Sequence, residues 1–116
     1  MIMYTKNYRE LNVEETDVEG LTVRWGINAS QGAGNFSMRL LELEPLKSTR
    51  LHKHDSEHEL YVLVGKGQVI TEDGSYPIRE GSFIYIPPNE THKFSNTGAS
   101  KLRMIDAVIF PSRETK

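Results

Sequence analysis

The sequence predicts an all-β protein, a single domain folded as a sandwich or barrel. Apolar residues occur in short runs, and no stretch shows the 3.6-residue period of an amphipathic helix. Turn-forming residues separate these runs about every eight to twelve residues, a spacing typical of sandwiches and barrels. The 116 residues are enough for one packed core and too few for two.

The first half of the chain predicts two strands. Residues 21–27 form the first, and a polar, glycine-rich loop follows over residues 28–35. Residues 36–43 form the second strand, which Pro45 ends. The acidic residues between Glu10 and Glu19 are interpreted as a solvated surface segment.

The second half predicts six more strands. Residues 60–64 are apolar at every position, which indicates a strand buried on both faces, between the barrel interior and a second layer or partner chain. Asp73-Gly74 predicts a hairpin turn. In the fifth of these strands, His92, Phe94 and Asn96 share one face. The six predicted strands cover residues 60–64, 68–72, 75–79, 82–86, 92–96 and 102–110.

Composition excludes several classes of function. With 14 basic and 16 acidic residues there is no broad cationic surface, so no nucleic-acid partner is expected. Apolar runs are far shorter than the roughly 20 residues that cross a bilayer, and no signal peptide is visible, so no membrane partner is expected. The absence of cysteine excludes disulfides and thiolate sites and fits a cytoplasmic protein.

The histidines form the clearest candidate site. Three of the four lie at His52, His54 and His58, and the fourth is His92. In an extended chain His52 and His54 share a face, and His58 has the parity of the inner face of the strand that follows. Neutral imidazole is a preferred ligand of borderline metals. The residues alone do not distinguish a metal site from an exposed loop in which the histidines gain and lose protons but bind no metal.

Two spaced motifs resemble those of the cupin family. The spacing H-x-H-x3-H-x6-G runs from His52 to Gly65, with histidine where glutamate is usual. The second motif, G-x5-P-x-G-x2-H-x3-N, is matched by Gly81, Pro87, His92 and Asn96, with Asn89 in place of its middle glycine. Asparagine tolerates the turn conformation required there. The sequence is most similar to small bacterial cupins with a four-histidine manganese site.

This resemblance implies a jelly-roll β-barrel (a double-stranded β-helix), often a homodimer, with a metal in the barrel mouth. The expected parts are residues 1–35 as an N-terminal arm with the first strand, packed on the barrel or on a partner, 36–110 as the barrel, and 111–116 as a tail. The expected ligands are His52, His54, His58 and His92. About one divalent transition metal per chain is expected, manganese first, with iron, nickel, zinc, cobalt or copper as alternatives.

Four neutral imidazoles leave the charge of such a metal uncompensated, which favours Lewis acidity and anionic ligands. An octahedral metal would keep about two open positions, whereas tetrahedral zinc could be closed and structural. The favoured function is a dioxygenase-like oxygenase acting on a small molecule. The alternatives are a metal-assisted isomerase or lyase and a non-catalytic module that binds small molecules.

Asp106 is the remaining candidate, because it interrupts an apolar final strand. It shares parity with Met104 and Val108, and the resemblance places this position near the metal. There it would orient a ligand or water or act as a general base. The alternatives are a salt bridge to Arg39 or Arg103, or an outward orientation. Glu59 has the opposite parity to His58 and is expected to point away from the metal.

Overall fold

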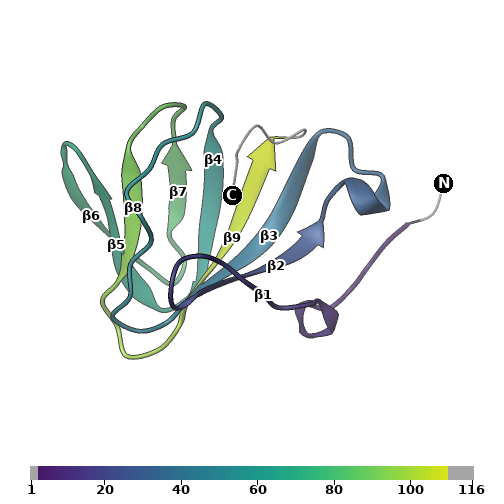
Figure 1. The fold of residues 1–116 in the computed structure, drawn as a ribbon, viewed down its shortest axis with the longest axis horizontal. Coiled ribbons are helices and arrows are strands. Elements are labelled where there is room, and N and C mark those ends of the chain that lie inside the picture. Colours follow the sequence, from purple (N-terminus) through teal and green to yellow (C-terminus); the bar gives the residue numbers. More distant parts are fainter. Residues whose placement is uncertain (1–2, 110–116) are drawn as a thin grey trace.

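The computed structural model describes residues 3–109, and this part of the chain folds into two antiparallel β-sheets that face each other (Figure 1). The larger sheet has six strands in the order β1-β2-β3-β9-β4-β7, and the smaller has three in the order β6-β5-β8. The all-β jelly-roll prediction is therefore confirmed. The strands are β1 (Glu14–Glu15), β2 (Leu21–Ile27), β3 (Phe36–Leu43), β4 (His58–Val64), β5 (Lys66–Thr71), β6 (Gly74–Arg79), β7 (Phe83–Ile86), β8 (His92–Asn96) and β9 (Leu102–Ile109).

The predicted strands match these elements closely, and the differences have local causes. Strands β2, β3 and β8 have the predicted bounds, while β4 begins two residues earlier than predicted, at His58. Residue 110, the predicted end of the last strand, lies outside the described residues. Strand β1 and two short 3-10 helices, η1 (Tyr8–Glu10) and η2 (Ala29–Gln31), were not predicted, because elements of two or three residues carry no periodicity.

The β5–β6 hairpin turns one residue earlier than predicted. Thr71 pairs with Gly74, so the two turn residues are Glu72 and Asp73 and not Asp73 and Gly74. Gly74 instead begins the return strand with φ of 144°, a backbone conformation that disfavours other residues. The hydroxyl of Thr71 also accepts a hydrogen bond from the backbone N–H of Asp73, which stabilises this tighter turn.

The hydrophobic core lies between the two sheets. Alternate residues of β4 and β9 point into it: Leu60, Val62, Leu102 and Met104 are each at most 4% exposed. Strand β8 contributes Phe94 from the opposite sheet. Leu60, Val62, Phe94 and Met104 therefore all point inward, and the face predicted to be shared by His92, Phe94 and Asn96 is the inner face of β8.

The outer face of β4 corrects one prediction. Residues 60–64 were expected to be buried on both faces, but Tyr61, Leu63 and Val64 are 36, 39 and 41% exposed in the single chain. The neighbouring edge strand β7 adds the exposed side chains of Phe83 and Tyr85. No second layer covers this part of the sheet within residues 3–109.

The N-terminal arm covers another part of the same outer face. The guanidinium of Arg24 donates to the carbonyl oxygen of Tyr8 at 3.2 Å, and Arg103 donates to the hydroxyl of Tyr8 at 3.4 Å. Beneath them Glu42 is 2% exposed and pairs with Arg24 at 2.9 Å and with Arg103 at 3.0 Å. This buried carboxylate fixes the arm to the sheet on the side away from the histidines. Among residues 3–109, no helix has the length and apolar character required to span a lipid bilayer.

Candidate metal centre

His52 and His92 are neighbours because the chain between β3 and β4 runs beside β8 (Figure 1). The two residues form an antiparallel bridge with both backbone hydrogen bonds, 3.0 Å from His52 N to His92 O and 2.8 Å in the reverse direction. The ring centres lie 4.7 Å apart. A contact between residues forty positions apart in sequence is thereby fixed by backbone pairing.

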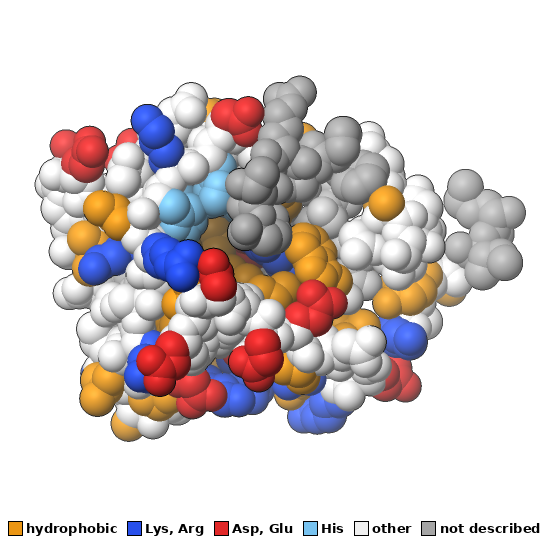
Figure 2. All heavy atoms as spheres, viewed as in Figure 1, with side chains coloured by type: hydrophobic (Ala, Val, Ile, Leu, Met, Phe, Trp, Pro, Cys, Tyr) orange, Lys and Arg blue, Asp and Glu red, His pale blue; other side chains and the backbone are white. Residues whose placement is uncertain are grey.

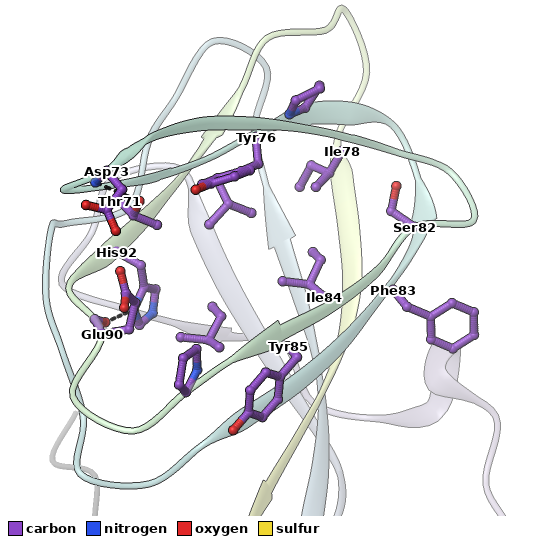
Figure 3. Close-up of a pocket in the computed structure, with 14 residues that line it drawn as sticks. Thr71, Asp73, Tyr76, Ile78, Ser82, Phe83, Ile84, Tyr85, Glu90 and His92 are labelled. Carbon is purple, nitrogen blue, oxygen red and sulfur yellow. Dashed lines mark hydrogen bonds between the residues drawn. The ribbon is translucent and has the colours of Figure 1, made fainter.

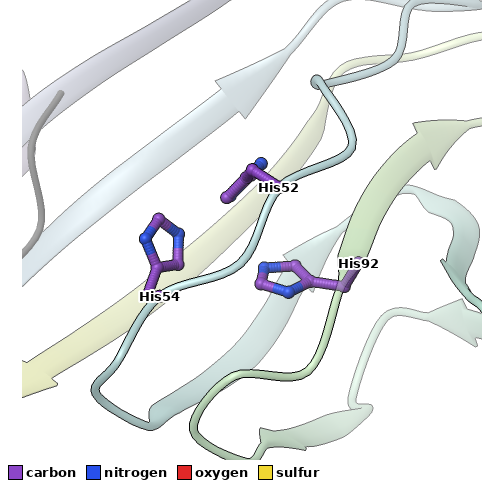
Figure 4. A group of neighbouring side chains, drawn as sticks. All are labelled: His52, His54 and His92. Carbon is purple, nitrogen blue, oxygen red and sulfur yellow. The ribbon is translucent and has the colours of Figure 1, made fainter.

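His54 joins the same group from the next alternate position. Its carbonyl oxygen accepts a hydrogen bond from the N–H of Asn89 at 2.6 Å, which ties the segment to the β7–β8 loop. Asn89 has φ of 65°, so the residue that replaces the motif glycine does adopt the left-handed turn conformation that the sequence predicted. One possible ligand atom from each of His52, His54 and His92 lies within 4.8 Å of the other two (Figure 4).

His58 lies beside this group and is not one of its three members. It begins β4, and its ring centre is 4.9 Å from that of His54 and 6.4 Å from that of His92. Its side chain is buried, 5% exposed. The fourth-ligand role of His58 therefore stays a prediction, with the ring close to the other three.

Hydrogen bonds fix which nitrogen of three of these rings can bind a metal. The Nδ1–H of His52 donates to the carbonyl oxygen of Arg50 at 2.6 Å, and that of His92 donates to the carbonyl oxygen of Glu90 at 2.7 Å. A carbonyl oxygen only accepts, so Nδ1 carries the proton and the lone pair lies on Nε2. In the same way the Nδ1–H of His58 donates to Asp106 Oδ1 at 3.0 Å.

Asp106 is almost fully buried, 1% exposed, and has two partners. Its Oδ1 accepts from His58, while its Oδ2 lies 2.8 Å from both Nε and Nη2 of Arg39. The inward orientation and the salt bridge to Arg39 that the sequence left as alternatives therefore occur together. With both oxygens engaged and little solvent access, the geometry favours an orienting role over that of a general base.

A cavity of about 670 Å³ opens beside the histidines. Figure 2 shows the histidine side chains at the edge of a hollow with hydrophobic side chains inside it. The histidines, Asp106 and Arg39 contribute polar groups to the cavity, and Glu14, Glu15, Asp17, Arg50 and Lys53 also line it. Apolar side chains form another part of its wall, with Leu21, Val23, Trp25, Leu41, Leu60 and Phe94 among them. A concave space that combines apolar surface with convergent polar groups is typical of a site for a small molecule.

Residues 14–18, which we call the strap, form one wall of this cavity. Asp17 pairs with Arg50 at 2.8 Å, and the hydroxyl of Thr16 donates to the carbonyl oxygen of Leu21 at 2.9 Å. The acidic segment was interpreted from the sequence only as solvated surface. Glu14 and Glu15 are indeed exposed, but the segment also borders the candidate site.

Two carboxylates lie at the start of β4: Glu59 on the strand and the half-buried Glu57 just before it. Glu59 is exposed, as its parity predicted. Partial burial and then the neighbouring Glu57 carboxyl raise the pKa of Glu59. The Tyr85 hydroxyl donates to Glu57 at 3.4 Å, and desolvation followed by the charge of Glu57 raises the pKa of Tyr85.

A second cavity, of about 510 Å³, lies between β6 and β7 (Figure 3). Tyr76, Ile78, Ile84 and Tyr85 are among the residues that line it. His92 lines both cavities, so this imidazole and the adjoining Ile86 separate the second space from the first. Of the four histidines, only His92 is among the residues that line the second cavity, whereas all four line the first.

Two residues near the site were not identified as functional from the sequence. Trp25 lines the main cavity, and the guanidinium of Arg39 lies 5.2 Å from the centre of its ring. Arg39 was considered only as a salt-bridge partner of Asp106. Its parity with Leu41 and Leu43 was the available signal, because a charged residue at an inward position needs a partner.

Comparison with known proteins agrees with this architecture. A family model described as the cupin domain matches residues 39–109. An oxalate-binding protein of Thermotoga maritima is 33% identical over 70 residues, covering 60% of this chain and 58% of its own length. An uncharacterized protein of Methanocaldococcus jannaschii is 36% identical over 58 residues, covering 49% of this chain and 46% of its own length. The chain thus spans about half the length of these curated relatives.

Among solved structures, the polyketide cyclase RemF of Streptomyces resistomycificus superposes with a TM-score of 0.89 at 26% identity. The match covers 97% of this chain and 83% of that one. A structure from Thermotoga maritima described as a predicted oxalate decarboxylase gives a TM-score of 0.76 at 24% identity, covering 91% of this chain and 98% of that one, and supports the fold alone.

Proposed function

Because this chain belongs to the cupin family, we propose that it is a metal-dependent enzyme that moves a proton on a small carbonyl compound, as cyclases and isomerases do. The observation that carries the proposal is the group of imidazoles in the wall of the 670 Å³ cavity. Three imidazoles with ligand atoms within 4.8 Å of one another fit a borderline divalent metal.

A metal held by these imidazoles would supply a Lewis acid that polarises a carbonyl oxygen. The chain's own residues have separate tasks. His52 and His92 keep Nε2 available as a ligand because the carbonyl oxygens of Arg50 and Glu90 hold their Nδ1 protons. The apolar wall, including Leu60 and Phe94, binds the hydrophobic part of the substrate and excludes water from the reacting end.

Similarity to a polyketide cyclase over 97% of this chain supports proton transfer in preference to the oxygenase that the sequence favoured. Cyclisation of a compound with several carbonyl groups removes a proton next to one carbonyl and joins the resulting carbon to the carbon of a second carbonyl. The C=O double bond of that second carbonyl becomes a single bond, its oxygen takes up a proton, and the resulting hydroxyl group leaves as water with a second proton from the neighbouring carbon. Such a step needs a Lewis acid and a dry cavity, but no dioxygen.

The test compares metals and atmospheres. Protein loaded with zinc or with manganese is incubated with linear poly-β-carbonyl compounds, with and without oxygen, and products are identified by mass spectrometry. We expect cyclised product, with loss of water, under both atmospheres and with zinc as well as manganese, and none with His54→Ala. A reaction that needs oxygen and fails with zinc would refute the proposal. Binding without turnover under every condition would also refute it and would support the binding module.

The dioxygenase-like activity is the second candidate. The observation that favours it is the donor set, since an all-imidazole group suits redox-active iron or copper. An octahedral metal held by four imidazoles would keep about two positions for substrate and oxygen. Oxygen uptake that depends on both the redox-active metal and a candidate substrate would support this function.

We also propose that the protein is a homodimer. The support is the exposed apolar patch on β4 and β7, formed by Tyr61, Leu63, Phe83 and Tyr85, where Phe83 is 85% exposed. The rings of Tyr61 and Phe83 pack with centres 4.7 Å apart, which gives the patch a defined shape. Contiguous apolar surface of this kind often marks an interface. Light scattering should give the dimer mass for the wild type and the monomer mass for Phe83→Glu, while a wild-type monomer at micromolar concentration would contradict the proposal.

A further inference from the structure

One row of side chains crosses the inner face of the larger sheet and ends at His58. Strands β2, β3, β9 and β4 are consecutive in the sheet. Trp25 pairs with Arg39, Arg39 pairs with Asp106, and Asp106 pairs with Leu60 on β4. His58 lies two residues before Leu60 and therefore points to the same face. The row thus comes from the strand register and does not depend on a loop.

Each contact in the row is short and directed. The Trp25 ring lies 5.2 Å from the guanidinium carbon of Arg39, a distance typical of a cation–π contact. Two nitrogens of Arg39, Nε and Nη2, both approach Asp106 Oδ2 at 2.8 Å. The other oxygen, Oδ1, accepts the Nδ1 proton of His58 at 3.0 Å. Arg39 therefore holds one carboxylate oxygen and leaves the second for the imidazole.

The two oxygens of the Asp106 carboxylate have different partners, and burial makes the loss of either partner costly. The side chains of Arg39, Asp106 and His58 are 10, 2 and 5% exposed. Water cannot replace a lost partner easily at such sites, so removing the guanidinium would leave a buried carboxylate with less support. The carboxylate would then be free to rotate, and the orientation of the His58 ring would no longer be fixed.

From this geometry we infer that Arg39 is a positioning residue for the candidate metal centre, acting on His58 through Asp106. Arg39 reaches the His58 ring through the Asp106 carboxylate, which contacts both side chains. It fixes the plane of the Asp106 carboxylate, and the carboxylate fixes the tautomer and the rotation of the His58 ring. Partners of this kind, one step behind a ligand, typically change metal affinity by about 10- to 100-fold.

The inference rests on the proposed metal site, and the two can fail separately. Absence of metal binding in the wild-type protein would refute the site itself. Metal binding by the wild type with unchanged affinity in the Arg39 variants would refute only the role of Arg39.

The chain offers a matched control on the opposite face of the same pair of strands. Arg103 also pairs with a buried carboxylate, that of Glu42 at 3.0 Å, and Glu42 lies on β3 directly opposite Arg103 on β9. This ion pair contacts Tyr8 of the arm and not the histidines. Arg103→Gln therefore perturbs a buried ion pair of the same strands without disturbing the row.

The experiment measures dissociation constants for Co²⁺ by competition with a chelator, together with the visible spectrum of bound Co²⁺, in the wild type, Arg39→Gln and Arg103→Gln. We expect Arg39→Gln to bind about tenfold more weakly with an altered spectrum, and Arg103→Gln to keep the wild-type affinity and spectrum. Wild-type affinity and spectrum in Arg39→Gln would overturn the inference. Equal losses in both variants would overturn it too, because affinity would then follow general stability.

Arg39→Lys keeps the experiment decisive if Arg39→Gln does not fold. Lysine retains the positive charge but offers a single nitrogen where arginine offers two in a fixed plane. We expect a folded Arg39→Lys protein to bind Co²⁺ more weakly than the wild type and more strongly than Arg39→Gln where that variant folds. A folded Arg39→Lys protein with the wild-type dissociation constant and spectrum would overturn the role assigned to the two-nitrogen contact.

Discussion

Asp106→Asn separates the structural and the metal-orienting contributions of a buried carboxylate. The substitution keeps the shape of the side chain and removes its charge. An amide offers one oxygen and one NH₂ group, so it can accept from His58 or from Arg39 but not from both in their present positions. One of these two buried donors must lose its partner.

The expected magnitudes follow from this loss. Leaving the guanidinium of Arg39, which is 10% exposed, without a carboxylate should cost about 3 kcal/mol, the lower end of the range for breaking a buried pair, since one hydrogen bond is retained. For a chain of 116 residues, with an unfolding entropy of about 2.1 cal/mol/K per residue, that corresponds to a fall of about 12 °C in melting temperature. Metal affinity should fall by about 10- to 100-fold, or about 1.4 to 2.7 kcal/mol.

The assays are thermal unfolding of the metal-free protein and chelator competition for the metal. Glu42→Gln is the matched control, because its side chain is 1% exposed and pairs with Arg24 and Arg103 on the opposite face of the sheet. We expect Glu42→Gln to lose stability and to keep metal affinity. If Asp106→Asn keeps the wild-type metal affinity, whether or not stability falls, the orienting role of Asp106 is wrong.

Three further predictions concern pH and packing. Imidazole has a pKa of about 6.5 and binds metal only when it is neutral. The rise in melting temperature on metal addition should therefore be present at about pH 7.5 and lost at about pH 5. An equal rise at both pH values would refute histidine ligation. Leu43→Ala should cost about 2 to 5 kcal/mol in chemical unfolding because Leu43 is 0% exposed, whereas Leu46→Ala, at a residue 80% exposed, should cost little. Glu57→Gln should lower the pKa of Tyr85, followed by ultraviolet titration, because it removes a carboxylate that disfavours the phenolate; an unchanged pKa would contradict this assignment.

Much of the fold could be predicted because strand periodicity and turn residues act locally. The alternation of His92, Phe94 and Asn96 alone identifies the inner face of β8, and the three residues are at most 5% exposed. Strand β1 and the strap could not be predicted, since their position depends on pairing with β2 and on the contact of Asp17 with Arg50. The exposure of Tyr61 and Leu63 was also hidden, because an apolar outer face looks the same in sequence whether or not a partner covers it.

The candidate site could be predicted only in part, because some of its contacts are local in sequence and others are long-range. The spacing of His52, His54 and His58 is local, whereas the bridge between His52 and His92 is a long-range contact that only the motif pair indicated. The partners of Asp106 depend on strand register, which single-sequence patterns do not specify across strands that are distant in the chain. Arg39 was therefore visible only as one of two possible salt-bridge partners.

The most direct test of the central claim is the metal content of purified protein, measured by elemental analysis for the wild type, His54→Ala, His92→Ala and Glu59→Gln. We expect about one transition-metal ion per chain in the wild type and in Glu59→Gln, whose exposed side chain points away from the histidines, and little metal in either histidine variant. Metal retained at the wild-type level in both histidine variants would contradict the assignment of this cluster as a metal centre.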